Sequence, residues 1–409
     1  MNNRCNKLQF LAIIILYNNA AYSSSIDKPN RLERLSSTDK SNDSDNSSNL
    51  SPTSITNLSP TSAFFFPTSA NSLPKSLHSL PMSADLSPTN ESNNSAYLPI
   101  SMDKLNKYAR HIAMDTHFRP PVSIAEHDLD ALILSGVQHI ESHGERFNAR
   151  AGNGQQAHDV AYTLLDPTDR LHLIRQPTSI KYFCRELLAY FKGSLHVKDG
   201  LSQASSVWTT LANEDGDISS NYGYYVFHQR IPEANNITQY EWVIKNLDKS
   251  LDSRRAFINI NQPMHKIDTS LDFPCTLGMQ FFVKNDYLCC TVSSRSTDIY
   301  TGLPYDMGFF AFVTELVYKD LKERLYKKND RILKLGHVTM NANFTQIYDK
   351  TRSAALALVT RYDHTTHTKS RVFMPRIENA QETLADIYQE TSNSPIMQWI
   401  YKHAELPKS

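Results

Sequence analysis

The stretch 270–306 constrains this chain more than any other, because chemically distinct groups follow one another there at short intervals. Cys275 stands behind a proline and ahead of the apolar run 277–283. Arg-Ser-Thr-Asp then occupies 295–298, and Gly-Leu-Pro-Tyr-Asp occupies 302–306. The stretch therefore offers a candidate nucleophile, an anion-binding pair and a carboxylate, separated by a segment that is typical of a β-strand.

Helix and strand patterns alternate irregularly through the rest of the chain. The irregular order argues against a doubly wound parallel sheet, whose strands and helices alternate strictly. We therefore predict one α+β domain over residues 101–409. The expected helices are 123–139, 180–191, 240–251 and 309–325, and the expected strands are 255–260, 276–283 and 287–293.

The chain before this domain has a different composition. Residues 23–100 are rich in Ser, Pro and Asn, and we predict that they are disordered, because they offer too little apolar surface to offset the entropy of ordering. Residues 1–22 carry two basic residues and a short apolar run, which is typical of a signal or targeting segment. The apolar run is too short for a membrane span.

Charge and cysteine content exclude several function classes. Lys+Arg and Asp+Glu both number 42, so the overall charge gives no reason to expect binding to nucleic acid or to an anionic membrane. The five cysteines are an odd number and form no C-x-x-C pair, so we expect neither a disulfide framework nor a bound metal. A small phosphorylated substrate stays compatible with the sequence, because a local arginine cluster needs no global excess of charge.

Five blocks in a fixed order resemble the thymidylate synthase family. They begin at Arg150-Ala-Gly-Asn-Gly and include the helix around Arg185-Glu-Leu-Leu, the segment from Val207-Trp to Asn221-Tyr-Gly, Leu251-Asp-Ser-Arg-Arg, and the stretch that contains Cys275. The resemblance implies a thymidylate synthase-like fold, with a mixed β-sheet and flanking helices. It also implies an enzyme that transfers a one-carbon group from 5,10-methylenetetrahydrofolate to a pyrimidine nucleotide.

Three positions resemble deoxycytidylate hydroxymethylase more closely than thymidylate synthase. Thr276 follows the cysteine where the synthases carry His, Leu211 replaces a second Trp, and Asp306 replaces an Asn. A protonated Asp carboxyl matches the hydrogen-bonding edge of cytosine, whereas an Asn amide matches uracil. We therefore predict hydroxymethylation of carbon 5 of a cytidine nucleotide. The alternatives are a C5-methyltransferase acting on dUMP or dCMP, and a catalytically silent family member that binds nucleotide.

The resemblance also assigns roles to individual residues. Cys275 is the expected nucleophile at carbon 6, and we expect nearby arginines to lower its pKa. Glu186 lies in an apolar helix, where burial should raise its pKa and suit it to proton transfer. The expected folate contacts are Trp208, Asp298, Gly302 and Tyr305.

The nucleotide contacts implied by the family come from two subunits. Arg150, Arg295 and Ser296 are expected to bind phosphate within one subunit, and Arg254 and Arg255 to reach the site of its neighbour. This arrangement predicts a homodimer. The remaining expected substrate contacts are Thr276, Tyr222 and Asn341.

The sugar and the chain end depart from the family pattern. The family binds the sugar with a His and a Tyr two residues apart, and the best match here is Thr339 and Asn341, with His337 as another candidate. The sequence therefore does not distinguish deoxyribose from ribose, so dCMP is favoured and CMP remains an alternative. The family's C-terminal closing segment has no clear match in 397–409. A folate enzyme is expected in the cytoplasm or an organelle.

Overall fold

The computed structural model describes residues 120–409, apart from 176–177, 328–331, 363–371 and 407–409. The predicted targeting segment 1–22 and the predicted disordered segment 23–100 lie outside the described residues. The start of the predicted domain, 101–119, also lies outside them.

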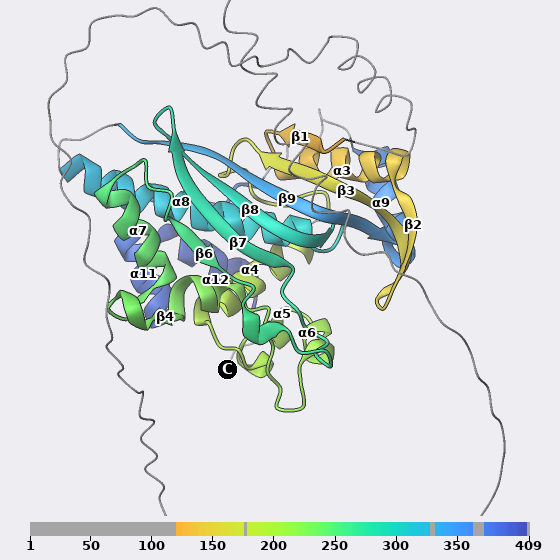
Figure 1. The fold of residues 1–409 in the computed structure, drawn as a ribbon, viewed down its shortest axis with the longest axis horizontal. Helices are drawn as coiled ribbons and strands as arrows, with labels where there is room; N and C mark the ends of the chain where they lie inside the picture. The colour runs from red at the N-terminus through yellow and green to blue at the C-terminus, as the bar shows by residue number, and fades with distance from the viewer. Residues whose placement is uncertain (1–119, 176–177, 328–331, 363–371, 407–409) are drawn as a thin grey trace, which may run out of the picture. The chain divides into compact units, whose positions relative to one another are not determined.

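A mixed seven-stranded sheet forms the centre of the domain (Figure 1). Its strand order is β1-β3-β9-β8-β7-β6, and β2 pairs with β3 beside this path. Most pairs are antiparallel, whereas β1 with β3 and β8 with β9 are parallel. The strands are β1 Val122–Glu126, β2 Glu145–Ala149, β3 Gly152–Leu164, β6 Phe257–Asn259, β7 Thr276–Lys284, β8 Tyr287–Asp298 and β9 Lys334–Tyr348, and a separate small pair is β4 Arg230–Ile231 with β5 Ile237–Thr238.

The helices pack against the sheet and against one another. The longest, α8, is buried at nearly every position in its first half, because it lies between the strands β8 and β9 and the helices α3, α4, α7 and α11. None of the helices in the described part of the chain is long and apolar enough to cross a membrane. The helices are α3 Leu129–His143, α4 Thr178–Lys192, α5 Leu201–Ala204, α6 Val207–Leu211, α7 Gln239–Lys249, α8 Leu303–Lys327, α9 Asp349–Arg361, α11 Ala380–Gln389 and α12 Pro395–Ala404.

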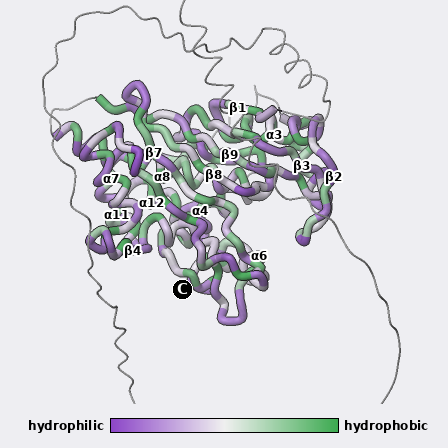
Figure 2. Tube along the Cα trace, viewed as in Figure 1, coloured by the Kyte–Doolittle hydropathy of each residue, from purple (hydrophilic) through white to green (hydrophobic). Residues whose placement is uncertain are grey.

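A tight hairpin joins β7 to β8. Its two connecting residues, Asn285 and Asp286, have φ values of 52° and 65°, which suit the right-handed twist of the flanking strands. The tips of this hairpin and of the β2–β3 hairpin are hydrophilic (Figure 2). The hairpin fixes the register of β7 against β8 as far as Gly278, opposite Ser293, and a one-residue register shift then places Thr276 opposite Ser294.

The sheet and helices confirm the predicted α+β class and correct one predicted helix. Residues expected to begin a helix at Ser123 form strand β1, which pairs with β3. The helix begins at Leu129, because the Asp128 side chain caps it by accepting a hydrogen bond from the Ala131 amide at 2.8 Å. The other predicted elements exist with shifted ends, and α8 starts six residues earlier than expected, at Leu303.

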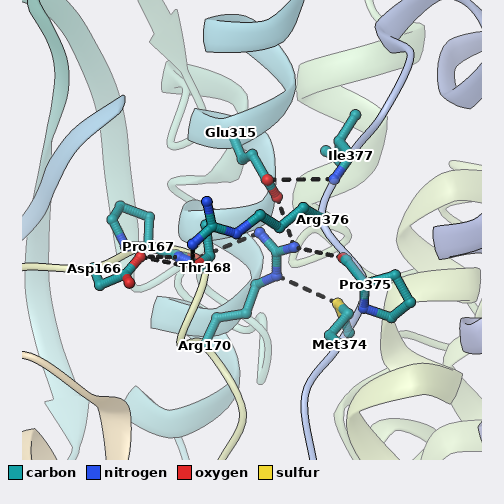
Figure 3. Close-up of polar contacts among 9 residues, drawn as sticks. All are labelled: Asp166, Pro167, Thr168, Arg170, Glu315, Met374, Pro375, Arg376 and Ile377. Atoms are coloured by element: carbon teal, nitrogen blue, oxygen red, sulfur yellow. Dashed lines mark hydrogen bonds and ion pairs between the residues drawn. The ribbon is translucent and has the colours of Figure 1, made fainter. Parts of the chain in front are cut away.

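A buried ion pair fixes α8 to two surrounding segments (Figure 3). The Arg170 and Glu315 side chains lie 2.7 Å apart, and both are almost completely buried. Arg170 also contacts the Met374 sulfur at 3.3 Å, and Glu315 accepts a hydrogen bond from the Ile377 amide at 3.2 Å. The pair therefore holds the loop after β3 and the segment before α11 against α8, whose first turn carries Asp306.

We expect Arg170→Met to lower the free energy of unfolding by about 3–5 kcal/mol, because it leaves the Glu315 charge buried without compensation. Urea unfolding of the full chain measures this loss. The double variant Arg170→Met/Glu315→Leu should recover most of it, since an apolar pair removes the uncompensated charge. A single variant as stable as the wild type would contradict this view of the pair.

Candidate active site

A cavity of about 750 Å³ opens beside Cys275, between α4, α6, the first turn of α8 and the carboxyl ends of β8 and β9. It brings together most of the residues singled out from the sequence. Those that line it are Arg150, Glu186, Trp208, Tyr222, Cys275, Arg295, Ser296, Asp298, Gly302, Tyr305 and Asp306.

Cys275 is held by contacts on both sides. Upstream, the Asp272 carboxylate accepts hydrogen bonds from the Ser219 and Ser220 amides at 2.6 and 2.8 Å. Downstream, the Cys275 carbonyl accepts one from the Arg295 amide at 2.9 Å and one from the Ser294 hydroxyl at 3.2 Å. These contacts fix the cysteine at the start of β7 without using its sulfur.

The thiol of Cys275 stays available for chemistry. Burial raises its pKa, and the Arg295 guanidinium and the Ser296 hydroxyl, whose oxygen lies 3.7 Å from the sulfur, oppose that effect. Burial has the larger influence, so the net shift is upward. Arg295 therefore lowers the pKa as expected, but that expectation left out the desolvation, which outweighs the arginine.

Two arginines converge on the segment that precedes Cys275. Arg295 donates to the Phe273 carbonyl at 2.6 Å and to the Ser296 hydroxyl at 3.2 Å, and its guanidinium lies over the Phe273 ring. Arg150, in the turn between β2 and β3, donates to the Leu271 carbonyl at 2.7 Å. Both guanidinium groups line the cavity, where they can bind an anion such as phosphate.

Glu186 lies on α4 and is 4% exposed. Its carboxylate accepts a hydrogen bond from the Tyr182 hydroxyl at 2.7 Å. Burial raises the pKa of Glu186 to about 8, and the nearby Asp306 adds to the shift, while the bond from Tyr182 opposes it. At neutral pH this carboxyl therefore carries a proton most of the time and can act as an acid.

Asp306 lies in the first turn of α8, and a tight turn after β8 positions it. The Asp298 carboxylate accepts hydrogen bonds from the Tyr300 and Thr301 amides at 2.8 and 2.9 Å, and the Asp306 amide bonds the Gly302 carbonyl at 3.1 Å. Burial raises the pKa of Asp306 to about 7. Its protonated and ionised forms are thus both populated near neutral pH.

The Asn221-Tyr222-Gly223 motif brings Tyr222 into the cavity. Asn221 donates to the Ala189 and Ser194 carbonyls at the end of α4. Gly223 passes so close to the Tyr190 carbonyl that a Cβ atom would lie within 1.9 Å of it. The Tyr222 ring consequently stacks on the Tyr190 ring, with their centroids 5.8 Å apart.

Aromatic rings form the opposite wall of the cavity. The Tyr305 and Tyr182 rings lie 4.4 Å apart, and the Trp208 indole donates to the Tyr182 hydroxyl at 3.3 Å. Leu211 lines the same wall one turn after Trp208. This wall offers flat apolar faces next to the proton-carrying Glu186.

Four of the predicted substrate contacts do not line this cavity, and Thr276, Arg254 and Arg255 are three of them. Thr276 is fully buried beside Cys275, so a direct contact with substrate is not available to its side chain. Arg254 and Arg255 are exposed on the loop before β6, at the edge of the sheet. Both arginines lie outside the cavity of their own chain, so they do not contact a ligand that is bound there.

Asn341 was assigned to the wrong part of β9. It pairs with Ser293 in mid-sheet and lines a separate hollow near β1. The cavity is reached five residues later, roughly 16 Å along the strand, by Gln346 and Tyr348. These two residues have the same spacing of two that the resemblance required, and that spacing could have identified them.

Further cavity residues escaped the sequence reasoning. Arg175 donates to the Tyr300 carbonyl at 2.9 Å and lies over the Tyr300 ring, and Lys350 follows β9. Tyr182 and Tyr190 belong to the predicted helix, but their positions there look like ordinary core positions. No local sequence pattern distinguishes any of these residues.

A protein-family model described as thymidylate synthase matches residues 133–389. The match covers more than half of the chain. It includes every residue proposed for the cavity and both exposed arginines.

We expect Glu186→Gln to be more stable than the wild type at alkaline pH. The carboxyl binds its proton more tightly when folded, so wild-type stability falls as pH rises from the ordinary pKa of 4.5 towards about 8. The stability advantage of the variant should be roughly 3–4 kcal/mol larger at pH 8 than at pH 5. Urea unfolding at pH 5 and pH 8 measures it, with the exposed Glu214→Gln as the control. A gain that does not change with pH would contradict the assignment.

Proposed function

Because the chain belongs to the thymidylate synthase family, we propose that it transfers a one-carbon unit from methylenetetrahydrofolate to carbon 5 of a cytosine nucleotide. The product carries a hydroxymethyl group. Deoxycytidylate is the favoured substrate and cytidylate the alternative. The observation that carries this choice of base is the Asp306 carboxyl, which faces the cavity with a pKa of about 7.

The hydrogen-bonding edge of the base supports cytosine. Cytosine presents an acceptor nitrogen next to a donor amino group, whereas uracil presents a donor nitrogen next to an acceptor oxygen. A protonated Asp306 donates from one oxygen and accepts at the other, which matches cytosine. Each mismatched polar group would be left unpaired at a cost of about 1–3 kcal/mol.

Cys275 and Glu186 support the chemistry at the pyrimidine ring. Carbon 5 becomes nucleophilic when a thiolate adds to carbon 6, and Cys275 offers its sulfur beside Arg295, which offsets part of the cost of ionising the buried thiol. Glu186, protonated at neutral pH, can give a proton to the base and take it back. Elimination of the thiolate then releases the substituted base.

The cavity fits the proposed folate. Methylenetetrahydrofolate would supply the one-carbon unit, and the volume of about 750 Å³ suits a nucleotide together with a flat bicyclic ring. Trp208 and Tyr305 offer aromatic faces for that ring, and Asp298 and Gly302 form the adjoining turn. Leu211 occupies less space than a second indole, which leaves room for the water that forms the hydroxymethyl group.

Gln346 and Tyr348 are the proposed sugar contacts. Both line the cavity from the last residues of β9 and take the roles first given to Thr339 and Asn341. An amide and a phenol can bond a sugar hydroxyl without carrying charge. Arg150, Arg295 and Ser296 are the proposed phosphate contacts.

A second copy of the chain is the proposed source of further phosphate contacts. Arg254 and Arg255 lie outside their own cavity and are exposed at the β6 edge. The resemblance gives twin arginines at this position to the neighbouring site. Leu277 on β7 and Phe344 on β9 remain 40% and 44% exposed, which is apolar surface suited to a homodimer.

The base preference tests the proposed reaction. With dCMP, CMP, dUMP and UMP labelled with tritium at carbon 5, the wild type should release tritium fastest from a cytosine nucleotide, and Cys275→Ala should release none. Asp306→Asn should shift the ratio of rates towards uracil by roughly 10- to 100-fold, because it exchanges the matched base. An unchanged ratio would contradict the role of Asp306.

Two further outcomes would contradict the proposed reaction and support a different function. Strong absorbance from dihydrofolate would identify a methyltransferase, because that product accompanies hydride transfer to the carbon-5 substituent. No tritium release from any of the four nucleotides would identify a catalytically silent nucleotide-binding protein.

Mixing two inactive variants tests the shared site. Cys275→Ala lacks the nucleophile and Arg254→Ala/Arg255→Ala lacks the donated arginines, so a mixed dimer keeps one complete site. Subunit exchange should restore about a quarter of wild-type activity. The control is Arg361→Ala, a substitution at the exposed end of α9. A mixture of Arg361→Ala with Cys275→Ala should be no more active than Arg361→Ala alone. No recovery in mixtures that do form mixed dimers would mean that the arginines serve their own chain.

A further inference from the structure

The Tyr182 phenol joins the Trp208 indole to the Glu186 carboxyl. Tyr182 lies one helical turn before Glu186 on α4, so both side chains face the cavity. The Trp208 Nε1 lies 3.3 Å from the Tyr182 hydroxyl, which in turn lies 2.7 Å from Glu186 Oε1. The three side chains form a continuous hydrogen-bonded chain that ends at the proposed proton-transfer group.

This chain has a fixed direction. An indole N–H can only donate, so the Tyr182 oxygen accepts from Trp208. The single Tyr182 proton is then left for Glu186 Oε1, which is the other hydrogen-bond partner of this hydroxyl among the described residues. Burial and the neighbouring Glu186 raise the pKa of Tyr182, so the phenol keeps that proton.

Packing holds the Tyr182 ring in this position. Its centroid lies 4.4 Å from that of Tyr305, on the first turn of α8, with the ring planes tilted by 57°. Trp208 on α6 and Tyr305 on α8 therefore both contact Tyr182, which holds its ring from two other helices.

We propose that Tyr182 is a positioning residue that keeps Glu186 Oε1 as an acceptor and leaves Oε2 as the atom that gives and receives protons in the cavity. This inference rests on the proposed function for the reaction itself. The hydrogen-bonded chain and its effect on Glu186 are properties of the free protein. They can be measured without turnover.

Infrared titration of the full-length protein measures the effect directly. The protonated carboxyl stretch is assigned to Glu186 by its loss in Glu186→Gln. Tyr182→Phe should move its midpoint to higher pH, because the phenol donates to the ionised form and opposes the effect of burial. Trp208→Phe should shift it in the same direction by less, since it frees the Tyr182 proton without removing it. Tyr190→Phe, which removes another buried phenol from the cavity wall, should leave the midpoint in place.

Kinetics distinguish positioning from a general loss of structure. Tyr182→Phe should slow carbon-5 tritium release roughly 10- to 100-fold at saturating nucleotide with little change in KM. In a Glu186→Gln background the same substitution should cause no further loss, because Tyr182 acts through that carboxyl.

The infrared and kinetic measurements test the role of Tyr182 and the proposed function separately. An unchanged infrared midpoint in Tyr182→Phe, or an additive loss in the double variant, would overturn the positioning role. Absence of tritium release from the wild type would overturn the proposed function, and the infrared midpoint would still decide whether Tyr182 holds Glu186.

Discussion

The register of three neighbouring strands is the constraint on which the candidate site depends. The hairpin between β7 and β8 sets Gly278 opposite Ser293, a one-residue register shift then sets Thr276 opposite Ser294, and the parallel pairing of β8 with β9 sets Asp298 opposite Gln346. Cys275, the Arg295–Asp298 segment and the Gln346–Tyr348 segment therefore end at one cavity. A shift of one residue in either pairing would turn these side chains to the other face of the sheet.

Burial then decides the protonation of the groups that this register collects. Glu186 and Asp306 both have pKa values raised towards or above neutrality, and the Cys275 thiol is raised as well despite Arg295. A site that holds protons in this way suits a reaction that moves them on and off a neutral base. Burial also makes ionisation of these three groups unfavourable in the folded protein. The raised pKa values that suit the proposed reaction therefore lower the stability of the fold as the groups ionise.

The sequence was sufficient to identify those site residues that belong to short local motifs. Cys275, Arg295, Asp298 and Asp306 lie within one short stretch, and the tight hairpin and turn that join them leave little freedom in their placement. Asn341 failed because β9 holds two pairs of residues with the expected spacing of two, Thr339 with Asn341 and Gln346 with Tyr348, and only the second pair lies at the end that reaches the cavity. Tyr182 and Arg175 were missed because their roles come from contacts with α6 and α8. The start of α3 was misplaced since a short apolar run fits a strand or a helix until its pairing partner is known.

In the proposed reaction water, and not hydride, completes the transfer to carbon 5. Mass analysis of the nucleotide formed from dCMP and methylenetetrahydrofolate in water enriched in oxygen-18 tests this most directly. We expect a hydroxymethyl product that carries the heavy oxygen and a folate released without oxidation. A methyl product without the label, formed together with dihydrofolate, would contradict it.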